Sequence, residues 1–228
     1  MLGIFGDALT TDHISPGGEI PPNSPAGEYL QSIGIPPAGF NSYVGRRGNH
    51  HVMTRGTYGN VRIRNRMAGD REGWWTRIYP EGDEVTIPEA ATRYRQRKIP
   101  LIVLGGHDFG AGSSRDWAAK GPALLGVRAV IARSFERIHR SNLIGVGIVP
   151  LRFARADSVE TLGLDGSEEF AFEGIADGIG KRSPIAVSAR RRDGDAVRFE
   201  VQADVRSDAE ADLLQRGGMF QACLKQWS

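Results

Sequence analysis

A strand, a glycine-rich turn, a helix and a second strand follow one another near the middle of this 228-residue sequence. The apolar run 99–104 predicts a buried strand, residues 115–125 predict a helix, and residues 127–132 predict the next strand. Such a β-α-β unit places its turn at the carboxyl end of the first strand, where ligands bind in open α/β sheets. We therefore expect the chain to fold in the α/β class around this unit.

The turn, Gly110-Ala111-Gly112-Ser113-Ser114-Arg115, carries groups that suit an anion. The first N–H groups of a helix lack partners and carry the positive end of the helix dipole. Two hydroxyls and the planar fork of Arg115 add donors suited to a carboxylate or a phosphate. We interpret the turn as an anion site with an activatable serine. The alternative is a serine-capped helix start with Arg115 in a surface ion pair.

Two familiar glycine motifs do not fit this turn. A Walker loop needs a lysine followed by serine or threonine, and none follows these glycines. The nucleophile elbow of α/β hydrolases needs a glycine two residues after its serine, where Arg115 stands. Neither nucleotide binding of the Walker type nor serine-hydrolase chemistry is therefore indicated.

The rest of the chain reads as short elements separated by turns. Strands are expected at 2–5, 61–64, 147–151, 169–172, 184–189 and 197–201. Helical segments are expected near 26–30, at 87–95 with a proline in the first turn, at 134–140, and from Ser207, where Glu210 completes a capping-box pattern. Residues 68–84 are expected to form a surface excursion that contains two tryptophans.

Two pairs of neighbouring polar residues precede the β-α-β unit. Asp12 stands beside His13 and could fix its tautomer or line a site, although an Asx turn before Pro16 is the interpretation we favour. His50 and His51 are adjacent, and on a strand they would face opposite ways and could not share a metal ion. The surrounding basic residues suit either carboxylate binding or a solvated loop.

Composition narrows the classes of function. The net charge of +2 does not indicate a strong nucleic-acid-binding surface. The single cysteine, Cys223, excludes an internal disulfide and an iron–sulfur cluster held by cysteines of this chain alone. The first residues lack the pattern of a signal peptide, and no apolar stretch reaches membrane-spanning length, so a cytoplasmic location is expected.

Five motifs, taken together, resemble the C-terminal swivelling domain of the aconitase family. They are the segments 6–16 (GDALTTDHISP), 40–43 (FNSY), 46–50 (RRGNH), 110–120 (GAGSSRDWAAK) and 135–142 (FERIHRSN), in this order. The resemblance is strong over residues 2–153 and weaker over 154–228. It implies one swivelling domain over residues 1–228, with a layered β/β/α architecture.

The resemblance also implies a chemistry. The family dehydrates and rehydrates tricarboxylic acids, and a [4Fe–4S] cluster on the other three domains binds the substrate. Ser113 corresponds to the base that removes the carbon-bound proton, Arg115 to a residue that binds a substrate carboxylate, and Ser114 lies beside them. Asp12 and His13 would support the site from behind. The expected partners are therefore the cluster-bearing domains, in the same polypeptide or as a separate subunit, and a tricarboxylate; no metal is expected on this chain.

The sequence departs from the family pattern in two places. It carries no cluster cysteines, so it is either an excised domain or a separate subunit. Ile33 stands where citrate-using relatives commonly carry a substrate arginine, which is more like 2-methylcitrate dehydratases, and Arg55 is the nearest candidate for a second carboxylate contact. Reversible citrate–isocitrate conversion is the leading interpretation. The alternatives are 2-methylcitrate or 2-methylisocitrate dehydration, RNA binding, and a non-catalytic role in assembly.

Overall fold

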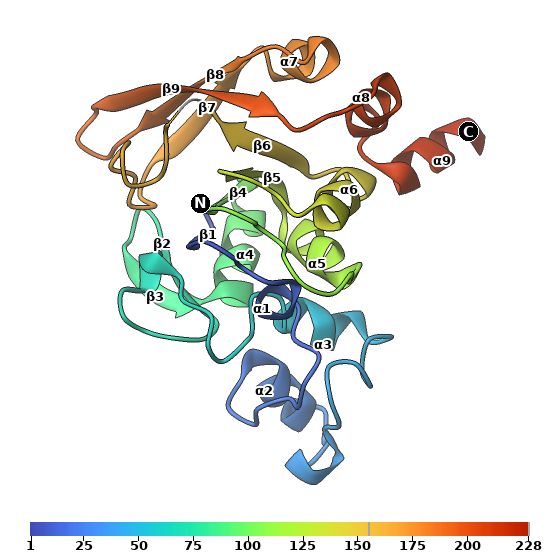
Figure 1. The fold of residues 1–228 in the computed structure, drawn as a ribbon. Coiled ribbons are helices and arrows are strands. Elements are labelled where there is room, and N and C mark those ends of the chain that lie inside the picture. The colour runs from blue at the N-terminus through green and yellow to red at the C-terminus, as the bar shows by residue number, and fades with distance from the viewer. Residues whose placement is uncertain (155, 228) are drawn as a thin grey trace.

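A computed structural model describes residues 1–154 and 156–227. Its centre is a seven-stranded sheet in the order β1-β4-β5-β6-β9-β8-β7 (Figure 1). The first four strands of that order are parallel: β1 (Gly3–Ile4), β4 (Leu101–Leu104), β5 (Val127–Ala132) and β6 (Val149–Phe153). The other three are antiparallel: β9 (Ala196–Ala203), β8 (Ile185–Arg190) and β7 (Glu169–Glu173). The expected α/β class is confirmed, and the last third of the chain extends the same sheet.

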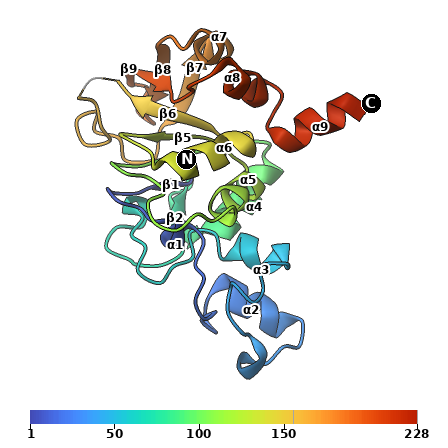
Figure 2. The ribbon, with the colours of Figure 1, turned by 45° about the vertical axis from the view of Figure 1, so that its right-hand side comes forward.

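Nine α-helices lie in the described part of the chain. Their bounds are α1 (Thr11–Ile14), α2 (Pro25–Ser32), α3 (His50–Arg55), α4 (Ile87–Gln96), α5 (Trp117–Leu125), α6 (Arg137–Gly145), α7 (Ile175–Lys181), α8 (Asp208–Gln215) and α9 (Met219–Trp227). Short 3-10 turns cover Pro37–Gly39 and Arg66–Ala68. The helix α9 projects from the body, at the opposite end from α2 (Figure 2).

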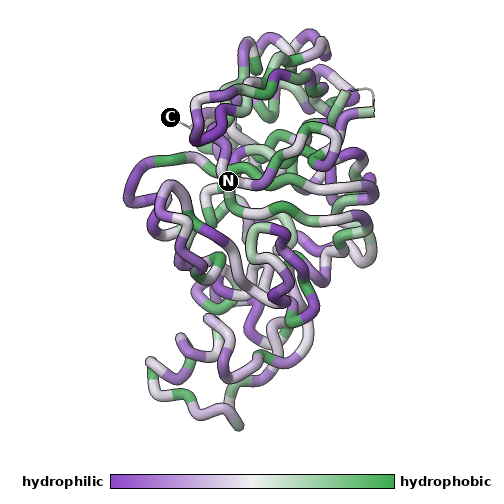
Figure 3. Tube along the Cα trace, turned by 90° about the vertical axis from the view of Figure 1, so that its left-hand side faces the viewer, coloured by the Kyte–Doolittle hydropathy of each residue, from purple (hydrophilic) through white to green (hydrophobic). Residues whose placement is uncertain are grey.

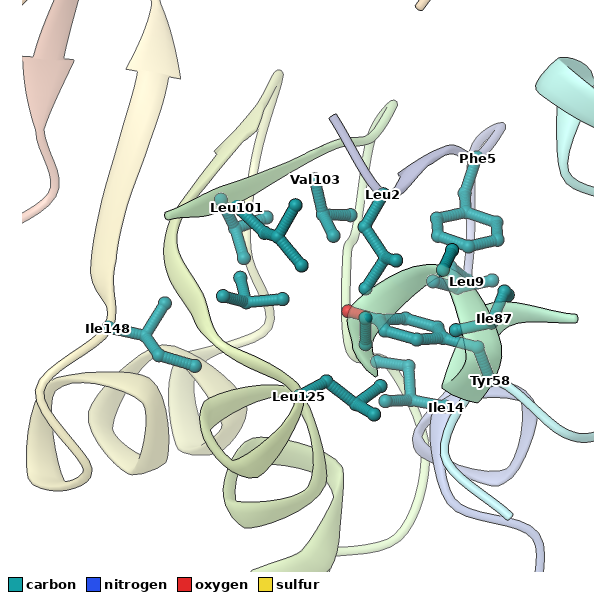
Figure 4. Packing of buried hydrophobic residues seen from close by; sticks show 14 of the residues in the cluster. Leu2, Phe5, Leu9, Ile14, Tyr58, Ile87, Leu101, Val103, Leu125 and Ile148 are labelled. Carbon is teal, nitrogen blue, oxygen red and sulfur yellow. The ribbon is translucent and has the colours of Figure 1, made fainter. Parts of the chain in front are cut away.

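The two faces of the sheet bury different clusters. Along β4, Leu101 and Val103 belong to one cluster, whereas Ile102 and Leu104 face the other, as the alternation of a strand requires. On the first face α4 and α5 cover the parallel strands (Figure 4). On the second face α7 and α8 pack against the antiparallel strands. The apolar strands run through the middle of the molecule, between more polar loops (Figure 3).

Most expected elements are confirmed with shifted ends, but the strand expected at residues 61–64 is wrong. Residues 61–64 form a turn rather than a strand, because the Asn60 side chain accepts from the N–H of Arg62 and Val61 is 51% exposed. The excursion 68–84 includes an antiparallel hairpin of β2 (Trp75–Ile78) and β3 (Asp83–Thr86). His50 and His51 open a helix, with ring centroids only 3.9 Å apart.

The expected capping box of α8 is half formed. The Ser207 hydroxyl accepts from the N–H of Glu210 at 3.2 Å. The Glu210 carboxylate does not accept from the N–H of Ser207, as a full capping box requires. It accepts two hydrogen bonds from the Arg140 guanidinium, at 2.8 and 2.9 Å. Arg140 is 3% exposed, so this two-pronged ion pair fastens α8 to α6 inside the molecule.

Candidate anion site at the carboxyl ends of the parallel strands

Three loops meet where β1, β4 and β5 end. The N–H of His107 donates to the Asp7 carboxylate, and the N–H of Ala8 donates to the carbonyl of His107, each at 2.7 Å. The N–H of Phe109 donates to the carbonyl of Ser134 at 3.0 Å. The loops after the three strands are therefore joined into one unit, at the edge of the sheet where the sequence predicts a ligand site.

The backbone of this unit is unusual. Ala8 and Asp108 have positive φ angles of 53° and 54°, although both carry a Cβ, and Gly110 and Gly112 have φ angles of 83° and 99°. Such conformations cost free energy and cluster at functional sites. Glycine is favoured at position 110 for two reasons: its positive φ angle, and the space around it, because an added Cβ would lie 2.1 Å from Cδ2 of His139.

The serines do not cap a helix. Ser113 and Ser114 are exposed, and α5 begins only at Trp117, after Asp116, whose side chain makes no capping bond. The alternative interpretation, a serine-capped helix start, is therefore wrong, and the helix begins two residues after its expected start at Arg115. In the described part of the chain, however, the backbone N–H groups of residues 112–115 have no hydrogen-bond acceptor. These free donors, rather than the helix end, are the backbone groups of the loop that suit an anion.

Arg115 is held by one side of its guanidinium. Its Nη1 donates to the Asp12 carboxylate at 2.6 Å and to the carbonyl of Ser15 at 2.9 Å. The other Asp12 oxygen accepts from the amide of Asn60 at 3.0 Å, which orients that carboxylate. Among the described residues nothing bonds Nη2 or Nε of Arg115. That free edge of the fork suits the two oxygens of a ligand carboxylate.

His13 is fixed by its neighbour Thr10 and not by Asp12. The backbone N–H of Thr10 donates to Nδ1 of His13 at 3.1 Å, so Nδ1 acts as an acceptor there. The Thr10 hydroxyl in turn accepts from the N–H of His13, which completes a capping box around α1. The Asx turn that we favoured is therefore wrong: the segment is a helical turn, and Asp12 faces Arg115 instead.

Arg55 lies away from the Ser113 loop. Its guanidinium stacks over the Tyr29 ring, 4.3 Å from the centroid, and donates to the carbonyl of His51 at 3.0 Å. It lines a groove of about 720 Å³ between α2, α3, α4 and α5, and none of the described residues lining that groove comes from the Ser113 loop. The structure therefore does not bring Arg55 together with Arg115. Ile33 ends α2 and is 51% exposed.

Sequence reasoning did not single out three residues that shape the site: Thr11, Asn60 and His139. The His139 ring is 1% exposed, lies against Gly110, and packs at 5.7 Å from the Phe109 ring. Burial lowers the pKa of His139 to about 4, and neither ring nitrogen has a partner among the described residues. The sequence indicated Thr11 and His139 only indirectly, because both fall within motifs that resemble the aconitase family.

Metal ligands are not gathered in the described residues. No group of three or more His, Cys, Asp or Glu side chains there could hold an ion. Cys223 is exposed on α9. The helices described include none that is long and apolar enough to cross a membrane.

Fold and site define an α/β domain whose Ser113 loop carries free backbone donors, two serines and a half-engaged arginine. The chain belongs to the aconitase C-terminal domain family, whose model matches residues 26–156. It is 50% identical over 224 residues to aconitate hydratase A of Thermus thermophilus, which covers 98% of this chain and 25% of that protein. It is 49% identical over 228 residues to aconitate hydratase A of Legionella pneumophila, an alignment that covers 100% of this chain and 26% of that protein.

The chain therefore spans about a quarter of the length of these curated relatives. A crystal structure of 3-isopropylmalate dehydratase from Methanocaldococcus jannaschii aligns with 98% of this chain and 91% of that one, at 16% identity and a TM-score of 0.45. That degree of likeness adds nothing to the assignment, which depends on the sequence relationship.

Proposed function

We propose that this chain is the domain of an aconitase-type hydro-lyase that supplies the base, Ser113, and a carboxylate-binding arginine, Arg115, to a tricarboxylate. The observation that carries the proposal is the half-engaged guanidinium of Arg115 beside the free N–H groups of residues 112–115. The relatives are named aconitate hydratase A, which favours citrate and isocitrate as substrates.

The residue types suit proton removal next to a carboxylate. Taking a proton from that carbon builds negative charge on the neighbouring carboxylate, and donors already aimed at the charge stabilise it. Ser113 receives the proton, which a serine hydroxyl does only if its anionic form is strongly stabilised in a closed, dry site. Here Ser113 is exposed, so the proposal requires another part of the protein to cover the loop.

The chain supplies only part of such a site. Its described residues do not fit a [4Fe–4S] cluster, so the cluster that the resemblance implies would be held by the remaining three quarters of the protein. We propose that those cluster-bearing domains belong to the same polypeptide, as the length of the relatives favours.

The test compares two serine variants in the longer protein that contains this chain with its cluster. Ser113→Ala should lower kcat for citrate by at least about 10²–10⁴-fold, the usual contribution of a general base. Ser114→Ala, next to it, should change mainly KM. Cluster content is measured for each variant as the control. Near-normal kcat in Ser113→Ala with a raised KM would make Ser113 a binding residue and overturn the proposed role.

A further inference from the structure

Thr11 contacts the Ser113 loop through both its backbone and its side chain. Its backbone N–H donates to the carbonyl of Ala111 at 2.8 Å, and its hydroxyl donates to the carbonyl of Ser113 at 2.7 Å. The two accepting carbonyls lie on either side of Gly112, whose φ of 99° turns the chain. Thr11 therefore bonds the loop at two points, the carbonyl of Ala111 and the carbonyl of Ser113.

The described residues give this part of the loop little other support. Within the described chain, the Thr11 hydroxyl makes the one hydrogen bond to any of residues 112–114. The helix α5 begins three residues beyond Ser114, so helical bonds do not fix the serines. Without the Thr11 hydroxyl, the peptide that carries the Ser113 side chain would keep its place only through its chain neighbours.

Among the described residues, the Thr11 hydroxyl makes no second hydrogen bond. The cap of α1 is made by Thr10 and His13, and it needs nothing from the Thr11 side chain. Threonines in helices often return their hydroxyl to their own backbone, whereas this one reaches a residue 102 positions away. Thr11 is 3% exposed, so it reaches the loop from beneath and is shielded from a ligand on the open side.

We infer that Thr11 is a positioning residue that sets the location of the Ser113 hydroxyl through the hydrogen bond to the Ser113 carbonyl. This inference rests on the proposed role of Ser113 as the base. A positioned base loses much of its rate when it is displaced by as little as 1 Å, on the order of 10²-fold. Loss of the Thr11 hydroxyl should therefore lower kcat more than it raises KM.

The experiment uses the longer, cluster-containing protein with Thr11→Val, Thr11→Ala and Thr11→Ser. Val and Ala both remove the hydroxyl, one preserving and one reducing the side-chain volume, and each should lower kcat roughly 10- to 100-fold with KM within about twofold. Thr11→Ser keeps the hydroxyl and should restore kcat to within about threefold of wild type. Should Thr11→Val not fold, Thr11→Ala gives the same comparison.

Thr76→Val is the matched control. Thr76 is also buried, and its hydroxyl donates to the carbonyl of Leu2 at 2.8 Å, so the variant loses a bond of the same kind between β2 and the residue that precedes β1. We expect similar losses of melting temperature in Thr76→Val and Thr11→Val, but reduced kcat only in Thr11→Val.

A double-mutant cycle separates this inference from the proposed function. Once Ser113 is alanine, Thr11→Val should have no further effect on the residual rate, because the residue acts through Ser113. Equal kcat in Thr11→Val and wild type, with Ser113→Ala inactive, would overturn the positioning role alone. Full kcat in Ser113→Ala would overturn the proposed function itself.

Discussion

Gly110→Ala should destabilise the chain by two separable effects. The φ of Gly110 is 83°, a left-handed conformation that costs an alanine about 1–2 kcal/mol. The new Cβ would also lie 2.1 Å from Cδ2 of His139, which is buried and cannot move into solvent. Overpacking of this kind costs about 1–3 kcal/mol. We therefore expect a total loss of about 2–5 kcal/mol in the free energy of unfolding.

Gly34→Ala is the matched control for the backbone effect. Gly34 has a φ of 84°, but an added Cβ would meet nothing within 4 Å. For a chain of this size a loss of 1 kcal/mol lowers the melting temperature by about 2–4 °C. Thermal melts should therefore show a decrease of roughly 2–8 °C for Gly34→Ala and roughly 4–20 °C for Gly110→Ala, with Gly110→Ala the lower of the two.

The steric part can be measured through His139. In a His139→Ala background the ring atoms Cδ2 and Cγ, which lie 2.1 and 2.2 Å from the added Cβ, are gone, and only the Cβ of residue 139 remains, at 2.5 Å. Gly110→Ala should then cost clearly less than it does in the wild-type chain. Equal melting temperatures of the two glycine variants, or an unchanged cost of Gly110→Ala without the ring, would refute the claim that His139 supports the Ser113 loop at Gly110.

Three further predictions concern stability, pH and the substrate contact. Glu210→Ala removes the carboxylate partner of the buried Arg140 guanidinium, which then keeps only neutral partners such as the Asp204 carbonyl, and it should cost about 3 kcal/mol in urea unfolding. Asp212→Ala removes an exposed ion pair with Arg216 and should cost under about 1 kcal/mol. Burial lowers the pKa of His139 from 6.5 to about 4, against a weaker opposing effect of Glu136. As the pH falls, the unfolded chain therefore binds this proton before the folded chain does, and the free energy of unfolding should fall by up to about 3 kcal/mol between pH 6.5 and 4. His139→Phe should lack this part of the pH dependence. In the longer, cluster-containing protein, Arg115→Lys keeps the charge but loses the fork, and steady-state kinetics should show a raised KM together with a lowered kcat.

Strong local patterns made the centre of the fold predictable. The apolar runs of β4 and β5 and the proline-led start of α4 each determine one structure locally, and the structure has all three. The elements that sequence reasoning missed lack such patterns. The helix α7 contains two glycines and begins after Gly174, which offers no side-chain cap, so its helical form depends on packing against β9 and α8.

The residues of the candidate site also differ in how far the sequence predicts their placement. Ser113 and Arg115 are close in sequence, so one turn suggested both. The ion pair between Asp12 and Arg115 joins residues 103 positions apart, and it exists because β1 pairs in parallel with β4 and brings their following loops together. The placement of Arg55 depends on the packing of α2 against α3, which no local pattern reports.

The central claim is that Ser113 removes the carbon-bound proton, and isotope exchange tests it most directly. The longer, cluster-containing protein is incubated with citrate in deuterated water, and the recovered tricarboxylates are analysed by mass for deuterium at carbon. Wild type should exchange this hydrogen, and Ser113→Ala should leave it unexchanged although citrate still binds with nearly unchanged affinity. Deuterium uptake by Ser113→Ala at the wild-type rate would contradict the claim and place the base on another residue.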